Sequence, residues 1–493
     1  MLTLIVALVG VLVAAELRVL FSIAAVPLLA RRGLPPCPVP PPVWPHVTVQ
    51  LAVYREHRVL ARLLRRIVDM EYPRDALAVQ VLDDSPGEDA ARTLAIVNQF
   101  SHCGVGVEYL SRGTRRGYKA GALNAGLQHA SSELIAYFDA DCAPRPNFLI
   151  KTVPYLNDPA VAAVQARWHY TNAKHSPLTI LQAAIFEGLF YFEIAARARL
   201  GAPVFYMGSA AVWRRKAMLD LGGWQESPFT AEDLDMAYRA GNAGWHVRYQ
   251  PDVVADSETV EAFLPFKAQQ RRWARAITRV AIDNWRGVLR SSRSVFAKLI
   301  EATTLLLHVA SPLTVAIALL SGLYVVAHFE RTALWVGTEW LFTALTLASP
   351  SALWLFVGQR GFHDDWKARA RLLSRATPAA AALMWSYIFG VWDELRGAER
   401  EFVVTPKDGE VPVLAGSRSR WLADHYAQIL AEGAFGIFAV TVGMLAAARG
   451  YYEACLPLLA VGVSSAASSV QSCSDALERA AALRAAAQPV SQI

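Results

Sequence analysis

The chain has 493 residues, of which 54% are hydrophobic, and this fraction is high for a soluble enzyme. The excess lies in residues 2–30 and after about residue 300, so the composition predicts a membrane protein that carries a sizeable globular insert. The net charge of +6, without a Lys/Arg run interleaved with aromatic residues, does not indicate nucleic-acid binding, and the five cysteines, without Cys-x-x-Cys pairing, indicate neither a zinc site nor a disulfide framework.

The apolar stretch at residues 2–30 is followed by Arg31 and Arg32. A cleaved signal peptide is shorter and carries its positive charge in front, so we expect a spanning helix instead. The positive-inside rule then places the following domain in the cytoplasm. Glu16 and Arg18 lie near the middle of this helix, where they either pair or snorkel, or face a polar conduit.

A stiff, extended linker is predicted from Pro35 to Pro45, and after it strand and helix patterns alternate. The predicted strands are 47–53, 78–82, 105–110 and 134–138, with helices at 58–70, 90–99 and 120–130 between them. This alternation predicts a parallel sheet with helices on both faces, which binds ligands at the carboxyl ends of its strands. The loops at those ends contain Tyr54, Glu56, Asp83, Asp84, Lys119, Asp139 and Asp141, each of which could alone be a cap or a solvated side chain.

The strand at 134–138 ends in two carboxylates one residue apart, Asp139 and Asp141, and prolines follow that stop the strand. Two acids at the end of a buried strand are costly unless they meet a cation or hydrogen bonds. The pattern therefore indicates a divalent metal held against the diphosphate of a nucleotide-sugar. The alternative is a solvated turn.

Further motifs follow in the polar block. An apolar run at 160–168 continues the domain, and the helix predicted at 178–199 either lies on the cytoplasmic bilayer face or packs in the core. An aromatic-lined turn occupies 205–209. The acids in Thr230-Ala-Glu-Asp233 open a helix, where a capping box is the alternative to a functional role. In Gln269-Gln-Arg-Arg-Trp273, Arg beside Trp suits phosphate or sugar recognition, or else an interfacial helix with snorkelling arginines.

Apolar segments return in the last third of the chain. Spanning helices are predicted at 303–327, 334–357, 435–448 and 452–468. Pro378–Trp392 is only about fifteen residues long, which is more typical of a re-entrant or interfacial helix. If this helix does not cross, residues 402–407 stay on the same side as the globular domain.

Five motifs occur in a fixed order: Asp83-Asp84, Asp139-x-Asp141, Glu232-Asp233, Gln269-x-x-Arg272-Trp273 and Phe402-x-Val-Thr405-x-Lys407. In these motifs the chain resembles the processive family 2 glycosyltransferases of the cellulose-synthase superfamily. Residues 79–85, 117–123, 138–141 and 164–168 are similar to the cellulose-synthase-like glucomannan and mannan synthases in particular. The resemblance covers about residues 47–408. It implies an α/β GT-A (Rossmann-like) catalytic domain inserted in an α-helical transmembrane bundle.

The resemblance also implies residue roles. Asp233 would be the general base with Glu232 supporting it, and Asp139 and Asp141 would hold Mg²⁺ or Mn²⁺. The nucleotide-sugar would contact Tyr54, Glu56, Asp83, Asp84, Lys119 and Asp139. The acceptor would contact Phe205, Gly208, Ser209, Gln269, Arg272 and Trp273, with Trp168 as a further candidate for stacking on a sugar. Phe402, Thr405 and Lys407 would belong to a gating segment over the donor.

The sequence departs from the family at three places. Arg55 stands where the family usually has Asn, which affects one wall of the nucleotide pocket, and Ala231 replaces the Thr of the family's Thr-Glu-Asp. The residues after Lys407 are largely apolar and leave out the cyclic-dinucleotide-binding domain of bacterial cellulose synthases, so no such regulation is expected.

The implied function is that of an inverting, metal-dependent, processive glycosyltransferase. It would extend a β-linked hexose polysaccharide from UDP-glucose or GDP-mannose and pass the polymer through the membrane. The linkage is expected to be β-1,4 by analogy with the family. The alternatives are a non-processive transferase of one sugar to a lipid carrier and a catalytically inactive export subunit. The expected partners are the nucleotide-sugar, the growing polysaccharide and the lipid bilayer of the inner or plasma membrane. The expected parts are 1–32 (transmembrane helix), 33–46 (linker), 47–285 (cytoplasmic catalytic domain), 286–375 (two transmembrane helices), 376–423 (interfacial helix and gating loop), 424–472 (two transmembrane helices) and 473–493 (tail).

Overall fold

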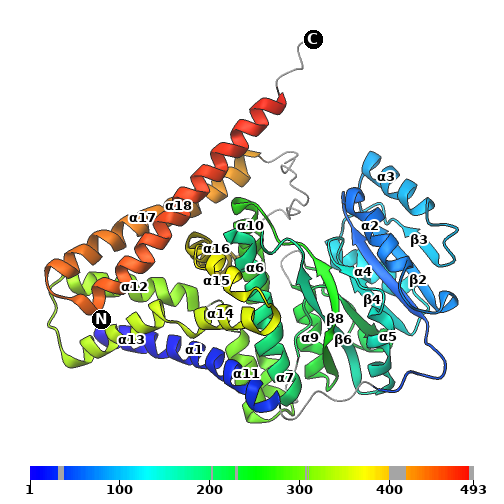
Figure 1. Cartoon of the computed structure of the whole chain (residues 1–493), viewed down its shortest axis with the longest axis horizontal. Coiled ribbons are helices and arrows are strands. Elements are labelled where there is room, and N and C mark those ends of the chain that lie inside the picture. The colour runs from blue at the N-terminus through cyan, green and yellow to red at the C-terminus, as the bar shows by residue number, and fades with distance from the viewer. Residues whose placement is uncertain are drawn as a thin grey trace.

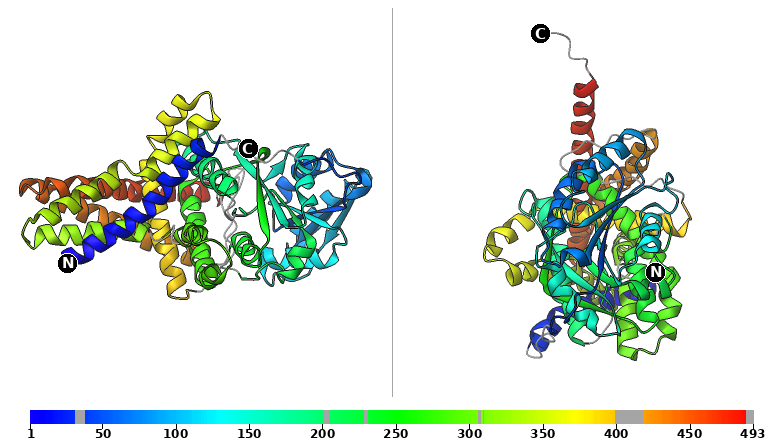
Figure 2. Two further views of the ribbon diagram at one scale, coloured as in Figure 1. Left: turned by 90° about the horizontal axis from the view of Figure 1, so that it is seen from below. Right: turned by 90° about the vertical axis from the view of Figure 1, so that its right-hand side faces the viewer.

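The computed structural model describes residues 1–30, 38–200, 204–227, 231–305, 308, 310–398 and 418–487. An open sheet covered by helices forms one end of the molecule, and a bundle of long helices forms the other (Figure 1). Figure 2 shows the same two parts from two further directions. The predicted gating residues Phe402, Thr405 and Lys407 lie outside the described residues.

In the described part of the chain, eight strands form one sheet in the order β3-β2-β1-β4-β7-β6-β8-β5. They are β1 (Val47–Val53), β2 (Leu77–Asp83), β3 (Gly106–Leu110), β4 (Leu134–Phe138), β5 (Ala143–Pro144), β6 (Val161–Tyr170), β7 (Ala211–Arg214) and β8 (His246–Ser257). The predicted parallel sheet is correct for β1 to β4, but β7 runs antiparallel to both β4 and β6. Antiparallel neighbours, unlike parallel ones, need no crossover helix between them. This explains why the half of the sheet that contains the short strand β7 has both parallel and antiparallel pairs.

The two faces of the sheet are covered as the alternation predicts. The covering helices are α2 (His57–Val68), α3 (Gly87–Asn98), α4 (Tyr118–His129), α5 (Phe148–Thr152), α8 (Arg215–Asp220) and α9 (Glu232–Asn242), with short 3-10 turns at η1 (Arg74–Ala76) and η2 (Val153–Asn157). Side chains alternate along β4, so that Leu134, Ala136 and Phe138 join the core under α2, while Ile135 and Tyr137 join the core under α4. Both faces of β4 are buried, which is why its sequence is an unbroken apolar run.

The helical part contains α1 (Leu2–Ala30), α6 (Pro177–Gly188), η3 (Leu189–Ile194), α7 (Ala195–Leu200), α10 (Phe263–Arg290), α11 (Val295–Leu305), α12 (Ala310–Val326), α13 (Ala333–Leu347), α14 (Pro350–Phe362), α15 (Trp366–Leu373), α16 (Thr377–Leu395), α17 (Arg418–Ala448) and α18 (Tyr452–Ala487). Among the described residues, five helical segments are long and apolar enough to cross a membrane: Leu2–Phe21, Pro177–Arg199, Ala333–Gly361, His425–Ala448 and Tyr452–Arg479. Ala310–Val326 is apolar but shorter.

Two predicted spanning segments each fall on two helices. The segment 303–327 includes the end of α11 and all of α12, and 334–357 lies within Ala333–Gly361, which contains α13 and α14. A break lies between α13 and α14 at Pro350, the first residue of α14, where the Ser349 hydroxyl accepts a hydrogen bond from the backbone of Ala352. Proline is favoured at such a position because its missing N–H would be unpaired there anyway. The helix predicted at 378–392 is longer than expected, since α16 has 19 residues.

The predicted helix at 178–199 packs in the core, which was one of its two alternatives. Its middle is a π-helical turn, η3, and the segment Pro177–Arg199 is largely buried between the sheet and the bundle. Arg18 of α1 pairs with Glu193 of this turn at 2.5 Å. Glu16 accepts hydrogen bonds from the backbone and the hydroxyl of Ser351 on α14. The two polar residues inside α1 therefore dock it against other helices.

Candidate active site

Polar residues from three neighbouring parallel strands meet at one edge of the sheet, because β2, β1 and β4 lie side by side. Their carboxyl ends lead into the loops that contain Asp83, Tyr54 and Asp139. Lys119 reaches this edge from the first turn of α4, and Glu232 from the first turn of α9. The folded chain thus gathers residues from widely separated parts of the sequence.

Lys119 is the centre of the gathered charges. Its Nζ lies 2.9 Å from Asp139 Oδ1 and 2.8 Å from Glu232 Oε1. The Tyr137 hydroxyl also donates to Asp139, and the Asp139 backbone N–H donates to Ser209 Oγ at 2.9 Å. One ammonium group and two hydrogen bonds therefore fix Asp139 at the carboxyl end of β4.

Asp233 lies beside this network, on the turn after Glu232. The Gly208 backbone N–H donates to Asp233 Oδ2, and a Cβ added at Gly208 would lie 3.4 Å from that oxygen and 3.4 Å from Trp168. Burial raises the pKa of Asp233 to about 7, with the Glu232 charge adding to the rise and Lys119 opposing it. A carboxyl with such a pKa can accept a proton near neutral pH.

Arg272 adds a second positive charge to the same pocket. Burial lowers the pKa of its guanidinium, while the nearby charges of Glu232 and Asp139 oppose that shift. Trp273, the next residue along α10, meets the Phe186 ring edge-on with centroids 5.8 Å apart. The Phe186 ring in turn lies 5.2 Å from the ring of Trp168. A row of aromatic rings therefore leads from the acids toward the helical part.

Other predicted acceptor residues take different positions. Trp168 Nε1 donates to the Ser209 carbonyl at 3.2 Å, which joins the aromatic row to the loop at 207–209. Phe205 is 6% exposed, and the Arg197 guanidinium lies 4.1 Å from its ring centroid. Phe205 thus packs in the interior behind the row. Gln269 is half-buried and accepts a long hydrogen bond of 3.4 Å from Gln270.

The acids predicted to contact the nucleotide are held by several hydrogen bonds. Asp83 is 1% exposed and accepts from the Tyr109 hydroxyl at 3.1 Å and from the Ser85 backbone at 2.8 Å. Asp84 is held by Arg112, whose Nε lies 3.0 Å from Asp84 Oδ1. Two of the acids predicted to contact the nucleotide therefore also hold the loops around the pocket.

Tyr54 forms the next wall of that pocket. The Arg115 guanidinium carbon lies 3.7 Å from the centroid of the Tyr54 ring and 4.9 Å from that of Tyr118. Arg55, the departure from the family pattern, has a positive φ of 59° and donates its backbone N–H to Ser85 Oγ at 2.7 Å. The loops after β1 and β2 are joined by this bond. Glu56, also predicted here, precedes α2 directly and is half-buried.

Asp141 belongs to the tight turn that follows Asp139, in which the Cys142 backbone N–H donates to the Asp139 carbonyl. Burial raises the pKa of Tyr170, and the charge of Asp141 adds to this rise, so the two side chains are near each other. Within the part of the chain that the structure describes, no three His, Cys, Asp or Glu side chains gather as a metal site. Two carboxylates are hard oxygen ligands that suit Mg²⁺ or Mn²⁺ when phosphate oxygens complete the coordination. The residues present fit such an ion together with the donor.

Several residues that hold the site were missed by the sequence analysis. Gln165 is fully buried in β6, where it donates to the Ser209 carbonyl at 3.0 Å and accepts from the Met207 backbone at 2.9 Å. A glutamine within an apolar strand was the available signal. Arg112 gave no signal, because its partner Asp84 follows another strand, and Tyr137 gave none, because an aromatic residue in a buried strand is ordinary core.

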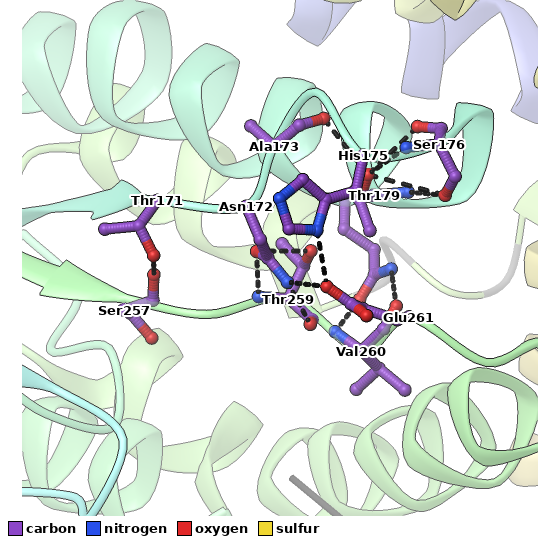
Figure 3. A network of polar contacts seen from close by, with 11 residues as sticks. Thr171, Asn172, Ala173, His175, Ser176, Thr179, Ser257, Thr259, Val260 and Glu261 are labelled. Atoms are coloured by element: carbon purple, nitrogen blue, oxygen red, sulfur yellow. Dashed lines mark hydrogen bonds and ion pairs between the residues drawn. The ribbon is translucent and has the colours of Figure 1, made fainter. Parts of the chain in front are cut away.

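A second set of polar contacts fixes the start of α10 (Figure 3). Asn172 donates to the Thr259 carbonyl and to Glu261 and accepts from the Thr259 backbone, while His175 contacts Glu261 at 2.7 Å. Gln182 of α6 exchanges two hydrogen bonds with the Val260 backbone. The loop that follows β6 and the loop that precedes α10 are thereby held together.

These features define the class of the protein as a GT-A glycosyltransferase fold. They are an open mixed sheet, a central strand that ends in a carboxylate, a basic residue between two acids and a separate buried acid. Residues 45–276 match the family described as "Glycosyltransferase like family 2". This part of the chain is therefore similar to family 2 glycosyltransferase domains.

Similar proteins agree with this assignment. "Probable glucomannan 4-beta-mannosyltransferase 7" of Oryza sativa subsp. japonica is 38% identical over 236 residues, which are 47% of this chain and 40% of the rice protein. "Probable glucomannan 4-beta-mannosyltransferase 11" of Arabidopsis thaliana is 36% identical over 236 residues, which are 47% of this chain and 53% of that protein. The chain thus spans about half the length of the curated relatives it matches.

Among solved structures, the "Mannosyltransferase PcManGT from Pyrobaculum calidifontis in complex with GDP-Man and Mn2+" is similar in fold, with a TM-score of 0.53. The match has 20% sequence identity and covers 80% of this chain and 100% of that chain.

Proposed function

We propose that this protein is a membrane-embedded, inverting glycosyltransferase that extends a β-linked hexose polysaccharide from a nucleotide-sugar. The observation that supports this most is the convergence of Lys119, Asp139 and Glu232 on one pocket, with Asp233 and the Trp168 ring directly beside it. Cations that can take a diphosphate and a carboxyl that can take a proton are thus adjacent.

In the proposed mechanism Asp233 is the general base. The acceptor hydroxyl loses its proton to the Asp233 carboxylate as its oxygen attacks the anomeric carbon, and the bond from that carbon to the diphosphate oxygen breaks. The Gly208 N–H fixes one carboxylate oxygen, so the other can point to the acceptor. Direct attack of this kind inverts the anomeric configuration, which converts an α-linked donor into a β-linked product.

Lys119 and Arg272 would stabilise the leaving diphosphate as its negative charge grows, because their charges are already placed at the acids of the pocket. Mg²⁺ or Mn²⁺ bound with the donor at Asp139 and Asp141 would supply further neutralisation of that diphosphate. Tyr54, Glu56, Asp83 and Asp84 would form the nucleotide side of the pocket.

The aromatic row and the apolar helices favour a polymer over a single transferred sugar. Trp168, Phe186 and Trp273 offer stacked or edge-on ring faces in succession, and sugar rings can slide along such faces without large barriers. The helices able to cross a membrane begin where this row ends, with α6, which carries Phe186, largely buried between the two parts. We place the catalytic domain on the cytoplasmic side, where nucleotide-sugars are made.

The names of the relatives favour GDP-mannose as the donor, and UDP-glucose is the competing choice. Membranes that contain the protein should be incubated with GDP-[14C]mannose or UDP-[14C]glucose, and the insoluble product should be digested with a β-mannanase or a β-glucanase. We expect mannanase-sensitive polymer from GDP-mannose. No incorporation from either donor would contradict the proposal, and label found only in an extractable lipid would establish the single-transfer alternative.

A matched pair of variants should accompany this assay. Asp233→Asn keeps the shape of the side chain but removes the base, and it should abolish polymer formation. Lys216→Gln removes a charge from the exposed Lys216–Asp220 pair on α8 and should leave synthesis unchanged. Unchanged synthesis by Asp233→Asn would remove Asp233 as the general base.

A further inference from the structure

Helix α10 has a row of basic residues at intervals of four, Lys267, Arg271, Arg275 and Arg279, which we call the basic row. Residues four apart lie on one face of a helix, one above the other. Arg272 and Trp273, which face the site, lie outside this row on a different face of the same turn. One rigid helix therefore carries both sets.

The basic row meets acids on the helices of the bundle. Arg271 forms two hydrogen bonds with Asp393 of α16, with Nε–Oδ2 at 2.7 Å and Nη2–Oδ1 at 3.1 Å. Arg275 Nε lies 3.0 Å from Glu394 Oε2. All four side chains are at most 9% exposed.

The third pair attaches α10 to the last two helices. Lys267 Nζ lies 2.7 Å from Glu432 Oε1 of α17, and both side chains are fully buried. Lys267 also donates to Ser472 of α18 at 2.9 Å, and Ser468 donates to Glu432 at 2.8 Å. Arg279, at the exposed end of the row, lies 3.6 Å from Glu394.

The backbones of α10 and α16 approach closely at the same place. A Cβ at Gly390 would lie 2.5 Å from the Arg271 carbonyl oxygen and 2.7 Å from the Ala274 Cβ. A glycine at this crossing lets the two helices touch, and it places Asp393 and Glu394 about one turn further along α16, opposite the basic row.

Buried ion pairs are weak evidence for stability, because apolar residues of similar size often stabilise a fold equally well. Their best-supported use is to specify register. A displacement of α10 along α16 by about half a turn, about 2.7 Å, would break the hydrogen bonds of Arg271 with Asp393 and of Arg275 with Glu394. The register of this row also determines where Arg272 and Trp273 sit relative to Asp233 and the entrance to the bundle.

We propose that Asp393 and Glu394 are positioning residues for polymer extension: through Arg271 and Arg275 they set the register of α10, and with it the place where Arg272 and Trp273 hold the acceptor. The inference rests on the proposed function. Transfer to water needs Lys119 and Arg272 at the diphosphate but no polymer at Trp273, so it should depend on this register less than extension does. Extension should depend on it strongly, since a misplacement of about 1 Å can cost on the order of 100-fold.

The test compares Asp393→Asn with an apolar variant that carries Arg271→Met, Arg275→Met, Asp393→Leu and Glu394→Leu. We expect the apolar variant to match the thermal stability of the wild type in detergent, because it leaves no buried charge unpaired. In both variants donor hydrolysis should fall less than extension, which should fall ~10- to 100-fold with shorter products. Lys216→Gln is the control for loss of a charge. Full-length product from the stable apolar variant would overturn the proposal.

A second readout reports the register without any activity. Spin labels at Ile282→Cys on α10 and Leu395→Cys on α16, both at exposed positions, should give a narrow distance distribution once the five native cysteines are replaced by alanine. We expect this distribution to shift or broaden in the apolar variant. An unchanged distribution would overturn the proposal, even if the wild type makes no polymer and the proposed function itself fails.

Discussion

At the scale of single residues, the site depends on the different surroundings of two adjacent acids, Glu232 and Asp233. Glu232 faces the ammonium group of Lys119 at 2.8 Å, whereas Asp233 is held by the Gly208 N–H and has its pKa raised to about 7 by burial. Two neighbouring carboxyl groups in different surroundings can take separate roles. Here Glu232 faces Lys119, while the pKa of Asp233 suits the exchange of a proton near neutral pH.

The pH dependence of synthesis should follow from that pKa. Below pH 7 Asp233 is mostly protonated and cannot accept a proton, so the rate should rise with pH through about 7 and then level off. A pH profile of polymer synthesis at saturating donor would measure this. The residual rate of Asp233→Asn should lack the rising limb, and a wild-type rate that is flat from pH 6 to 8 would contradict the assignment.

Gly208→Ala should impair the site directly. The φ of Gly208 is +55°, and an added Cβ would touch Asp233 and Trp168 at 3.4 Å. The backbone strain should cost about 1–2 kcal/mol, and a turn that relaxes to relieve it would move the Gly208 N–H away from Asp233 and lower synthesis at least tenfold. Gly244→Ala is a matched control, because its φ is +89° but nothing lies within 4 Å of the added Cβ. Gly244→Ala should lower the melting temperature about as much as Gly208→Ala does but should keep its activity. Equal losses of activity in the two variants would show that backbone strain alone causes the loss.

At the scale of elements, the strands that carry the site were predictable and their neighbours were not. The predicted bounds of β1 and β4 match the structure, since buried parallel strands have unbroken apolar sequences. β7 has four residues, and its place between β4 and β6 depends on pairing with distant segments. The loops that follow β1, β2 and β4 could therefore be predicted as ligand-binding, while the side chains that orient the acids from other elements, such as Gln165, could not.

The break at Pro350 was not predicted. The span predicted at 334–357 from hydropathy agrees with the segment Ala333–Gly361, which is long and apolar enough to cross a membrane, but hydropathy does not show that Ser349 and Pro350 start a new helix within it. The result brings α14 against α6 and η3, where Trp354 lies over Gly188.

Packing of α14 on α6 can be tested with glycines. A Cβ at Gly188 would lie 2.9 Å from the Trp354 ring, so Gly188→Ala should separate the helices and lower the melting temperature by several degrees, as over-packing costs about 1–3 kcal/mol. Gly337→Ala on α13 meets nothing within 4 Å and should be neutral or slightly stabilising. Thermal unfolding of the purified protein in detergent compares the two, and equal stability would contradict the close approach.

At the scale of the whole molecule, buried ion pairs join helices of the bundle to η3 and α10. Arg18 joins α1 to Glu193, and Lys267 joins α10 to Glu432. The paired residues are 175 and 165 positions apart in the sequence, so no local pattern reveals them. The order of motifs could predict the chemistry, but not the attachments that orient it.

Removal of one member of the Lys267–Glu432 pair should be costly. Glu432→Gln leaves the ammonium group of Lys267 buried without its counter-charge, and we expect a loss of about 3–5 kcal/mol. The double variant Lys267→Met, Glu432→Met should recover most of this loss, because no charge remains buried. Melting temperatures in detergent measure both. A double variant as unstable as the single one would show that the pair itself supplies stability.

The Arg271–Asp393 pair also restricts how this protein can diverge. Arg271 without Asp393 would be a buried, uncompensated charge, whereas Asp393 also pairs with Arg396, so loss of the carboxylate should appear together with loss of Arg271 when natural relatives with the same helix crossing are compared. A relative that has lost the carboxylate should also have lost the guanidinium, whereas the solvent-exposed pair Lys216–Asp220 should drift one position at a time.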